Sequence, residues 1–295
     1  MRVTEGSMAS DILSNVNRSK ERILQMQLQL ATMKRVQKPS DDPQAAQAIL
    51  RLNGLLGRND QFQKNVSEGV SMMQTTDSAL EQFGGIVDEA RQVMMAAVND
   101  PDPAQLATYA DRIDQLLSEA VDTANTRFNG KYIFGGTQTT DPPFILAADR
   151  SAVTMNPNGI TGKIQYPVGE GVLVDVNIDG QEAFSGTDPF TLLIQVRDSL
   201  RAGTVPTQAQ IDAATVAFNH ATDEGSKAGS MLQSLTANGD QLSGQRQQLE
   251  SLMSVQQDVD VADLAMKLNM EQNGLDAALS VAARILPKSL VDFLT

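Results

Sequence analysis

The chain has 295 residues, a formal net charge of −13 and no cysteine, so disulfide bridges and thiol chemistry are excluded. This acidic balance is unlike that of nucleic-acid-binding proteins, whose lysines and arginines gather on one face. No stretch reaches the roughly 18 apolar residues of a membrane-spanning helix, and the first residues lack the apolar core of a signal peptide. We therefore expect no nucleic-acid partner, no membrane span and no cleaved signal peptide.

The first predicted element is a helix over residues 11–36, in which apolar residues recur at alternating steps of four and three. Ser19 occupies the one polar position of this seven-residue repeat. Such a stripe is narrower than the buried face of an ordinary core helix, and it is typical of a helix that pairs with one other helix. The stripe comprises Ile12, Val16, Ile23, Met26, Leu30 and Met33.

A proline-containing hinge separates this helix from the next one. Lys38 precedes a proline, which disfavours helical backbone and predicts an extended residue there. Asp42 can cap a following helix, and the fixed φ of Pro43 suits its first turn. The hinge comprises Pro39, Ser40, Asp41, Asp42 and Pro43.

Two further helices are predicted before the composition changes. A very long one covers residues 44–98, and a second covers 104–128, where Asn129-Gly130 is expected to stop it. The turn between the two helices contains two prolines and two aspartates, which a helix–helix connection explains better than a metal loop. Residues 131–137 are typical of a short strand that runs into a glycine turn.

Residues 141–186 have β character and are expected to form a small, solvent-facing β domain inserted between helices. Apolar and polar residues alternate over 172–178, and Asp179-Gly180 is expected to make a hairpin turn. The Asp-x-Asn-x-Asp-Gly spacing at the end of this stretch resembles the start of an EF-hand calcium loop. The twelfth loop position would be Gly186, where a bidentate glutamate is needed, so a half-buried strand is favoured over a metal site.

Helices are predicted again after this segment. One covers residues 188–203, and another begins near residue 207 and leads into a second seven-residue stripe, which Pro287 is expected to end. The C-terminal stripe comprises Leu264, Leu268, Leu275, Leu279, Ala282 and Leu286.

The two stripes lie in segments of opposite charge. Residues 1–40 have seven basic and three acidic side chains, a net of +4, whereas residues 250–295 have three basic and seven acidic side chains, a net of −4. Opposite charges across a coiled-coil seam guide the choice of partner, although each exposed ion pair contributes little. The hypothesis is that the first and last helices pair with each other, and the alternative is two unrelated surface helices.

These patterns together predict a mainly α protein. It would be a long helical bundle with paired N- and C-terminal coiled-coil helices and a small inserted β domain. We expect a terminal coiled-coil domain from residues 1–42 with 257–295, a bundle domain from 43–140 with 187–256, and a β domain from 141–186.

Candidate catalytic residues are scarce. The single histidine, His220, lies on a polar helix face with Asp223 as its one nearby partner, and a surface histidine explains it most simply. No His-Glu-x-x-His motif, Cys/His cluster or Gly-x-Ser-x-Gly motif occurs. We therefore predict that the protein is not an enzyme and has no catalytic, cofactor-binding or metal-binding residues and no cofactor.

Several motifs resemble the flagellin family. They are Lys-Arg-Val-Gln-Lys-Pro-Ser-Asp-Asp-Pro at 34–43, Asn-Gly-Lys-Tyr-Ile-Phe-Gly-Gly-Thr at 129–137, Asp-Val-Asp-Val-Ala-Asp at 258–263, and the tail over 277–294. The first two motifs together are specific to the family. The prolines of the hinge indicate a member from the junction between flagellar hook and filament, because filament flagellins usually have small residues there.

The resemblance implies a structural subunit of the bacterial flagellum that forms a ring of identical copies at this junction. It implies a neighbouring hook-associated protein on the hook side, flagellin on the filament side, and an export chaperone bound to the C-terminal region. It further implies an extracellular location, reached by flagellar type III export without a cleaved signal peptide.

Two other functions stay open. A short filament flagellin would share the helices and the β segment. A secreted adhesin would use the β segment to bind a carbohydrate, although few aromatic side chains occur there to stack on a sugar ring.

Overall fold

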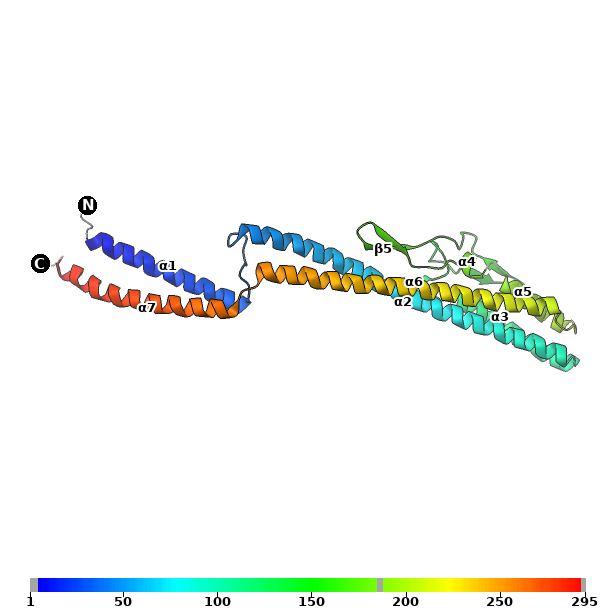
Figure 1. Cartoon of the computed structure of the whole chain (residues 1–295). Helices are drawn as coiled ribbons and strands as arrows, with labels where there is room; N and C mark the ends of the chain where they lie inside the picture. The colour runs from blue at the N-terminus through cyan, green and yellow to red at the C-terminus, as the bar shows by residue number, and fades with distance from the viewer. Residues whose placement is uncertain (1–4, 185–187, 293–295) are drawn as a thin grey trace. The chain divides into compact units, whose positions relative to one another are not determined.

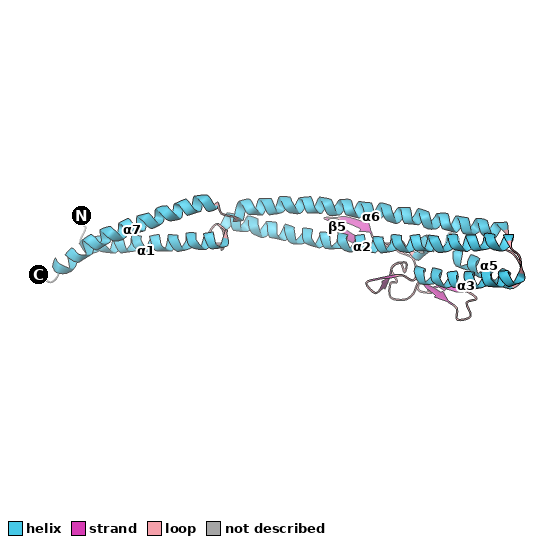
Figure 2. Ribbon diagram, turned by 90° about the horizontal axis from the view of Figure 1, so that it is seen from below, coloured by secondary structure: helices cyan, strands magenta, loops and turns pink. Residues whose placement is uncertain are grey.

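The computed structural model describes residues 5–184 and 188–292, and it gives side-chain surroundings for residues 10–184 and 188–283. Helices dominate the described chain, as predicted, and its strands are short (Figures 1 and 2). The helices are α1 (Glu5–Thr32), α2 (Pro43–Asn99), α3 (Pro103–Ala124), α4 (Gly180–Phe184), α5 (Pro189–Arg201), α6 (Gln208–Gln257) and α7 (Val261–Asp292). The strands are β1 (Arg127–Phe128), β2 (Lys131–Tyr132), β3 (Phe144–Leu146), β4 (Val153–Met155), β5 (Gln165–Gly169) and β6 (Val172–Asp175).

Two compact units make up the chain. The terminal unit contains residues 1–58 with 245–295, and the central unit contains residues 59–244. This division differs from the three expected parts, because α2 and α6 each contribute to both units and the β segment belongs to the central one.

The central unit is built on α2 and α6, which lie antiparallel and side by side in both views (Figures 1 and 2). Asn59 of α2 donates a hydrogen bond to the carbonyl of Leu242 on α6 at 3.1 Å. Gly239 allows a close approach one turn further along, since a Cβ there would lie 3.3 Å from Cγ1 of Val66. Helices α3 and α5 complete the bundle, and side chains of all four helices share one apolar core.

Helix α1 is shorter at its C-terminal end than predicted. It ends at Thr32, and Met33 takes a left-handed backbone conformation with φ of 55°. The Thr32 hydroxyl accepts a hydrogen bond from the side-chain amide of Gln37 at 2.7 Å, so the chain turns back on the helix end. By contrast, α7 continues through Pro287 to Asp292, so the expected end at this proline is wrong. A proline removes one backbone hydrogen bond from a helix interior, which bends a helix more often than it ends one.

The end of α3 was also predicted too far along the chain. The helix ends at Ala124, because the Asn125 side chain donates to the carbonyl of Phe144 at 2.8 Å and accepts from its N–H at 3.1 Å. Strands β1 and β2 follow as a tight hairpin. Asn129 and Gly130 at its turn have φ of 50° and 78°, the pair of positive values that a type I′ turn requires.

Strands β3 to β6 form two separate antiparallel hairpins, β3 with β4 and β5 with β6. The expected strand over 172–178 is shorter, and the hairpin turn predicted at Asp179-Gly180 is wrong. The Asp179 carboxylate instead accepts the N–H of Glu182 at 2.9 Å and starts the short helix α4. Asn177 is fully buried, and its side-chain oxygen accepts the N–H of Ile164 at 2.7 Å. The side-chain oxygens of Asn177 and Asp179 therefore accept backbone N–H groups within the protein.

Five phenylalanines join the β segment to the helices. The ring of Phe184 lies at the centre of this aromatic cluster, 4.7 Å from the ring of Phe83 on α2 and 5.3 Å from that of Phe144 on β3, measured between centroids. All five rings are buried. The segment thus has no core of its own and is not simply solvent-facing. The cluster comprises Phe83, Phe134, Phe144, Phe184 and Phe190.

A buried ion pair links α3 to α5. Arg197 is 3% exposed, and its guanidinium contacts Asp114 at 3.0 Å and donates to the carbonyl of Arg150 at 2.7 Å. Burial by itself raises the pKa of the Asp114 carboxyl, but hydrogen bonds from Arg197 and then Arg150 outweigh it and leave this pKa below its ordinary value of 3.8. The loop between β3 and β4 is therefore attached to the bundle by charge.

Replacing Phe184 with alanine should lower the free energy of unfolding by about 3–5 kcal/mol, because the truncation leaves a cavity among the rings. Urea denaturation followed by circular dichroism would measure this. The matched control is Leu173→Ala on β6, where the side chain is 58% exposed and the change should stay within about 0.5 kcal/mol. Equal losses in the two variants would contradict the shared aromatic core.

Replacing Asp114 with asparagine should lower the free energy of unfolding at pH 7 by about 3 kcal/mol, because Arg197 loses a buried partner. The pKa of Asp114 is lowered by folding, so its contribution is present above pH 3.8 and disappears as the pH falls below that value. Denaturation curves at pH 7 and pH 3 should show the gap to the unmodified chain closing. Asp111→Asn, at an exposed carboxylate 3.8 Å from Arg201, should change little at either pH.

Candidate assembly surface

Helices α1 and α7 pair through the two predicted stripes, and they lie side by side in both views (Figures 1 and 2). Among the predicted residues, Val16, Ile23, Leu264 and Ala282 are buried in this pair. Five others are half-buried along the same seam: Ile12, Met26, Leu30, Leu268 and Leu275. The structure therefore brings together the predicted residues from both ends of the chain, while their role in assembly stays a prediction.

Three predicted seam residues need a different description. Met33 lies beyond the end of α1 and is 62% exposed. Leu279 is 42% exposed and points away from the seam, where Ala278 takes the facing position. The side chain of Leu286 lies outside the described residues. A strict count of alternating four and three steps from Leu264 reaches residues 271 and 278, and this signal could have found both positions.

Glu271 is a seam residue that the predicted apolar stripe left out because its side chain is polar. Its Oε1 accepts a hydrogen bond from the Ser19 hydroxyl at 2.8 Å and another from Nε of Arg22 at 2.9 Å. The hydrogen bond from Arg22, with that from Ser19, holds the pKa of the Glu271 carboxyl below its usual value. Glu271 is therefore ionised at neutral pH and is held by two residues of α1.

The hinge is locally ordered by its two aspartates. The Asp41 carboxylate accepts the N–H groups of Lys38 at 2.9 Å and Gln37 at 3.1 Å, and these bonds lower its pKa. Asp42 accepts the N–H of Ala45 at 3.0 Å, which confirms the predicted helix cap. Pro39 and Ser40, between these contacts, are exposed.

Backbone hydrogen bonds join the hinge side of α1 to the connection between α6 and α7. The N–H of Arg35 donates to the carbonyl of Gln257 at 2.7 Å, and the N–H of Val259 donates to the carbonyl of Met33 at 3.1 Å. Lys34 and Asp258 form an antiparallel bridge between them. Sequence reasoning missed this pairing, because backbone contacts over such a separation have no side-chain signature.

Large apolar side chains remain exposed on the outward faces of both terminal helices. Burial along a single seam covers only one stripe of each helix, so the other apolar residues face solvent in the isolated chain. Contiguous exposed apolar surface commonly marks a protein interaction site. The exposed residues are Leu13, Leu24 and Leu28 on α1, and Met266, Met270, Leu279 and Val281 on α7.

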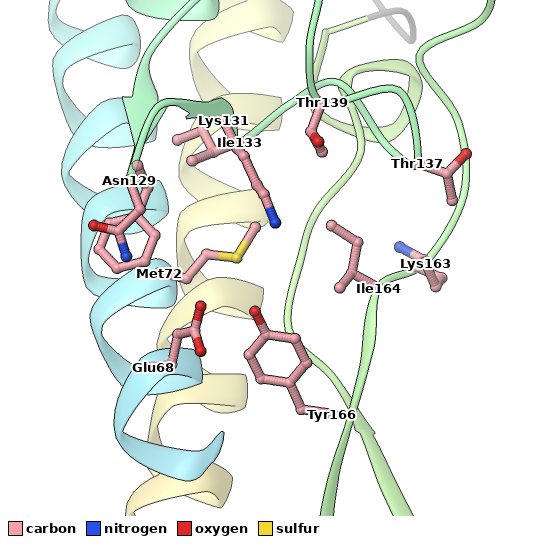
Figure 3. Close-up of a pocket in the computed structure, with 11 residues that line it drawn as sticks. Glu68, Met72, Asn129, Lys131, Ile133, Thr137, Thr139, Lys163, Ile164 and Tyr166 are labelled. Atoms are coloured by element: carbon pink, nitrogen blue, oxygen red, sulfur yellow. The ribbon is translucent and has the colours of Figure 1, made fainter. Parts of the chain in front are cut away.

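A cavity of about 370 Å³ lies in the central unit between α2, the β1–β2 hairpin and β5 (Figure 3). Glu68 and Tyr166 face each other across it, and Lys131 enters from the hairpin. Burial, together with the Glu68 charge, raises the pKa of Tyr166. Its lining combines apolar side chains such as Met72 and Ile164 with polar ones from α2, the hairpin and β5.

The described residues contain no group of three or more histidine, cysteine, aspartate or glutamate side chains placed to hold a metal ion. No helix in the described part of the chain is long and apolar enough to cross a membrane.

His220 was expected on the surface, but its side chain is half-buried. Its Nε2 donates a hydrogen bond to the carbonyl of Glu182 at 2.9 Å, and this bond holds α4 against α6.

Residues 3–139 match the family described as the bacterial flagellin N-terminal helical region. The chain is 32% identical over 149 residues to flagellar hook-associated protein 3 of Salmonella typhimurium, covering 49% of this chain and 46% of that protein. It is 27% identical over 129 residues to flagellin of Listeria monocytogenes, covering 42% and 45% respectively. The chain thus spans about half the length of the curated relatives it matches.

A solved structure shares the fold. It is a putative flagellar hook-associated protein from Vibrio parahaemolyticus, with a TM-score of 0.66 and 16% identity over 74% of this chain and 99% of that chain. The proteins named here are flagellins and flagellar hook-associated proteins.

Replacing Leu264 with aspartate should open the α1–α7 pair, because this seam residue is 6% exposed and loses about 1.5–3 kcal/mol of apolar burial. Hydrogen exchange of α1 amides in the full chain should then accelerate about tenfold or more. Leu279→Asp is the matched control on the same helix, and its 42% exposed side chain predicts unchanged protection. Equal acceleration in both variants would contradict the observed seam.

Proposed function

We propose that this chain is a member of the flagellin family and a structural subunit that joins the hook to the filament of the bacterial flagellum, and the match of residues 3–139 to the flagellin N-terminal helical region supports this. In this proposal, identical copies form a ring at the hook–filament junction. The likeness to flagellar hook-associated protein 3 supports this location over others in the flagellum.

The observation that carries the proposal is the exposed apolar face of the paired terminal helices. Leu24 and Met270 are 59% and 70% exposed in the single chain, on opposite members of the pair. Neighbouring copies packed around the same axis would cover these faces, and burying apolar area is the main driving force for such association. Exposed apolar side chains gathered on paired helices commonly mark a protein interaction site.

The proposed partners are other flagellar subunits. The chain would pack against further copies of itself, a neighbouring hook-associated protein on the hook side and flagellin on the filament side. An export chaperone would cover the apolar C-terminal helix before assembly. The protein would act outside the cell, after flagellar type III export that needs no cleaved signal peptide.

A short filament flagellin is the second candidate, and the similarity to flagellin of Listeria monocytogenes favours it. The hinge favours the junction subunit instead. Pro39 and Pro43 flank an ordered turn that Asp41 and Asp42 hold, whereas the resemblance places small residues there in filament flagellins. The adhesin stays the third candidate. Tyr166 is the one aromatic residue that the β segment contributes to the lining of the cavity, and it could stack on a sugar ring.

A strain that lacks this protein should keep its hooks, lack filaments and shed flagellin into the medium, and the full chain should restore the filaments. Electron microscopy and analysis of the medium would show this. Loss of flagellin itself would identify a filament subunit, and normal filaments would favour the adhesin.

In the same strain, Leu24→Asp should give hooks without filaments, because assembly would bury an unpaired charge at a cost of about 3–5 kcal/mol per copy. The secreted variant should keep the circular dichroism of the unmodified chain. Gln27→Asp, at an exposed polar position of the same helix, is the control and should restore filaments. Normal filaments with Leu24→Asp would contradict a role for the outward face.

A further inference from the structure

Each terminal stripe has one polar interruption, and the two interruptions face each other. Ser19 fills the polar position among the seam residues of α1, and Glu271 fills the corresponding position on α7. Their side chains are hydrogen-bonded at 2.8 Å although they are 252 residues apart in the chain. Arg22, at the edge of the seam, adds a bond to the same carboxylate oxygen at 2.9 Å. We call Ser19, Arg22 and Glu271 the polar layer.

The rest of the seam does not distinguish one alignment from another. Its other members are aliphatic side chains and methionine, which pack against one another after a slip of seven residues almost as well as before it. Such a slip would place Glu271 opposite Ile12 or Met26, since these are the seam residues seven positions from Ser19. The carboxylate would then face an apolar side chain in place of the Ser19 hydroxyl, and the neutral amide of Asn15 or Gln29 in place of the charged Arg22, so it would lose its seam donor and its charged partner.

The backbone contacts near the hinge act on the register from one end of the pair. They join Arg35 and Met33, which lie beyond the end of α1, to the connection before α7. They favour the observed register at the hinge end, because a slip of seven residues would break them. The polar layer lies within both helices, so it acts on the alignment along their length.

We propose that the polar layer specifies the register of the α1–α7 pair, at the expense of some stability. A polar group at a single core position of a coiled coil selects one alignment in this way, because every other alignment leaves it without a partner. The specificity-determining residue is Glu271, and Ser19 and Arg22 are the donors that recognise it. The proposal concerns how the chain pairs its own ends, so it does not depend on the flagellar role.

Disulfide trapping in the full chain tests the register directly, because the natural sequence has no cysteine. Val16 precedes Ser19 on α1 and Leu275 follows Glu271 on α7, so both are the next seam residues toward the free ends of the antiparallel pair, and Val16→Cys with Leu275→Cys reports the observed register. Val16→Cys with Leu268→Cys reports a slip of seven residues. With the polar layer intact, the first pair should form the disulfide at least about tenfold faster under the same mild oxidation.

Removing the layer with Ser19→Leu and Glu271→Leu should bring the two rates close to each other, while helix content and thermal stability hold or rise. A merely structural role would instead lower stability and leave the ratio of rates unchanged. The matched control is Glu21→Leu with Gln272→Leu, at exposed positions beside the layer, and it should keep the original ratio. An unchanged ratio after removal of the layer would overturn the proposal.

A conservative variant serves as a second test in case the double leucine variant misfolds. Glu271→Gln keeps a side-chain oxygen that accepts from Ser19 and Arg22, so it should retain a preference for the observed register. A glutamine variant that is folded by circular dichroism yet forms both disulfides at equal rates would also overturn the proposal.

Discussion

Two helices that contact only each other can bury a single narrow stripe of each, and the terminal unit depends on this constraint. The seam between α1 and α7 takes up the seven-residue stripe and leaves residues such as Leu28 and Met266 in solvent. The isolated pair therefore leaves large apolar side chains of both helices exposed to solvent. In the proposed assembly, neighbouring copies would cover these exposed side chains.

The central unit buries its apolar side chains through contacts within one chain. Its four helices share a continuous core, and the ring of Phe184 closes that core from the β segment. The buried charge of Arg197 ties α5 to Asp114 of α3. Because these contacts are all internal to residues 59–244, the central unit does not need the terminal helices in order to bury its own core.

Asn177, Asp179 and His220 are polar residues that form hydrogen bonds to the backbone of the central unit. Asn177 and Asp179 hold backbone groups, and His220 holds the carbonyl of Glu182. These hydrogen bonds fix the backbone where the chain leaves the β segment and where α4 meets α6.

The sequence by itself determined the elements whose causes are local. The seven-residue spacing of residues such as Val16 and Leu264 predicted two helices that pair, and Asp42 with Pro43 predicted where α2 begins. These predictions succeeded because helical periodicity, capping and the fixed φ of proline act over a few residues.

The tertiary structure decided what depends on partners distant in the chain. Asn125 ends α3 because it bonds to Phe144, and Asp179 starts a helix because the chain continues into a buried aromatic cluster. Glu271 meets Ser19 across the seam although the two residues are 252 positions apart, and nothing local to either residue indicates that contact. A stripe of apolar residues shows that a helix has a partner, but only the contacts across the seam show which residues meet.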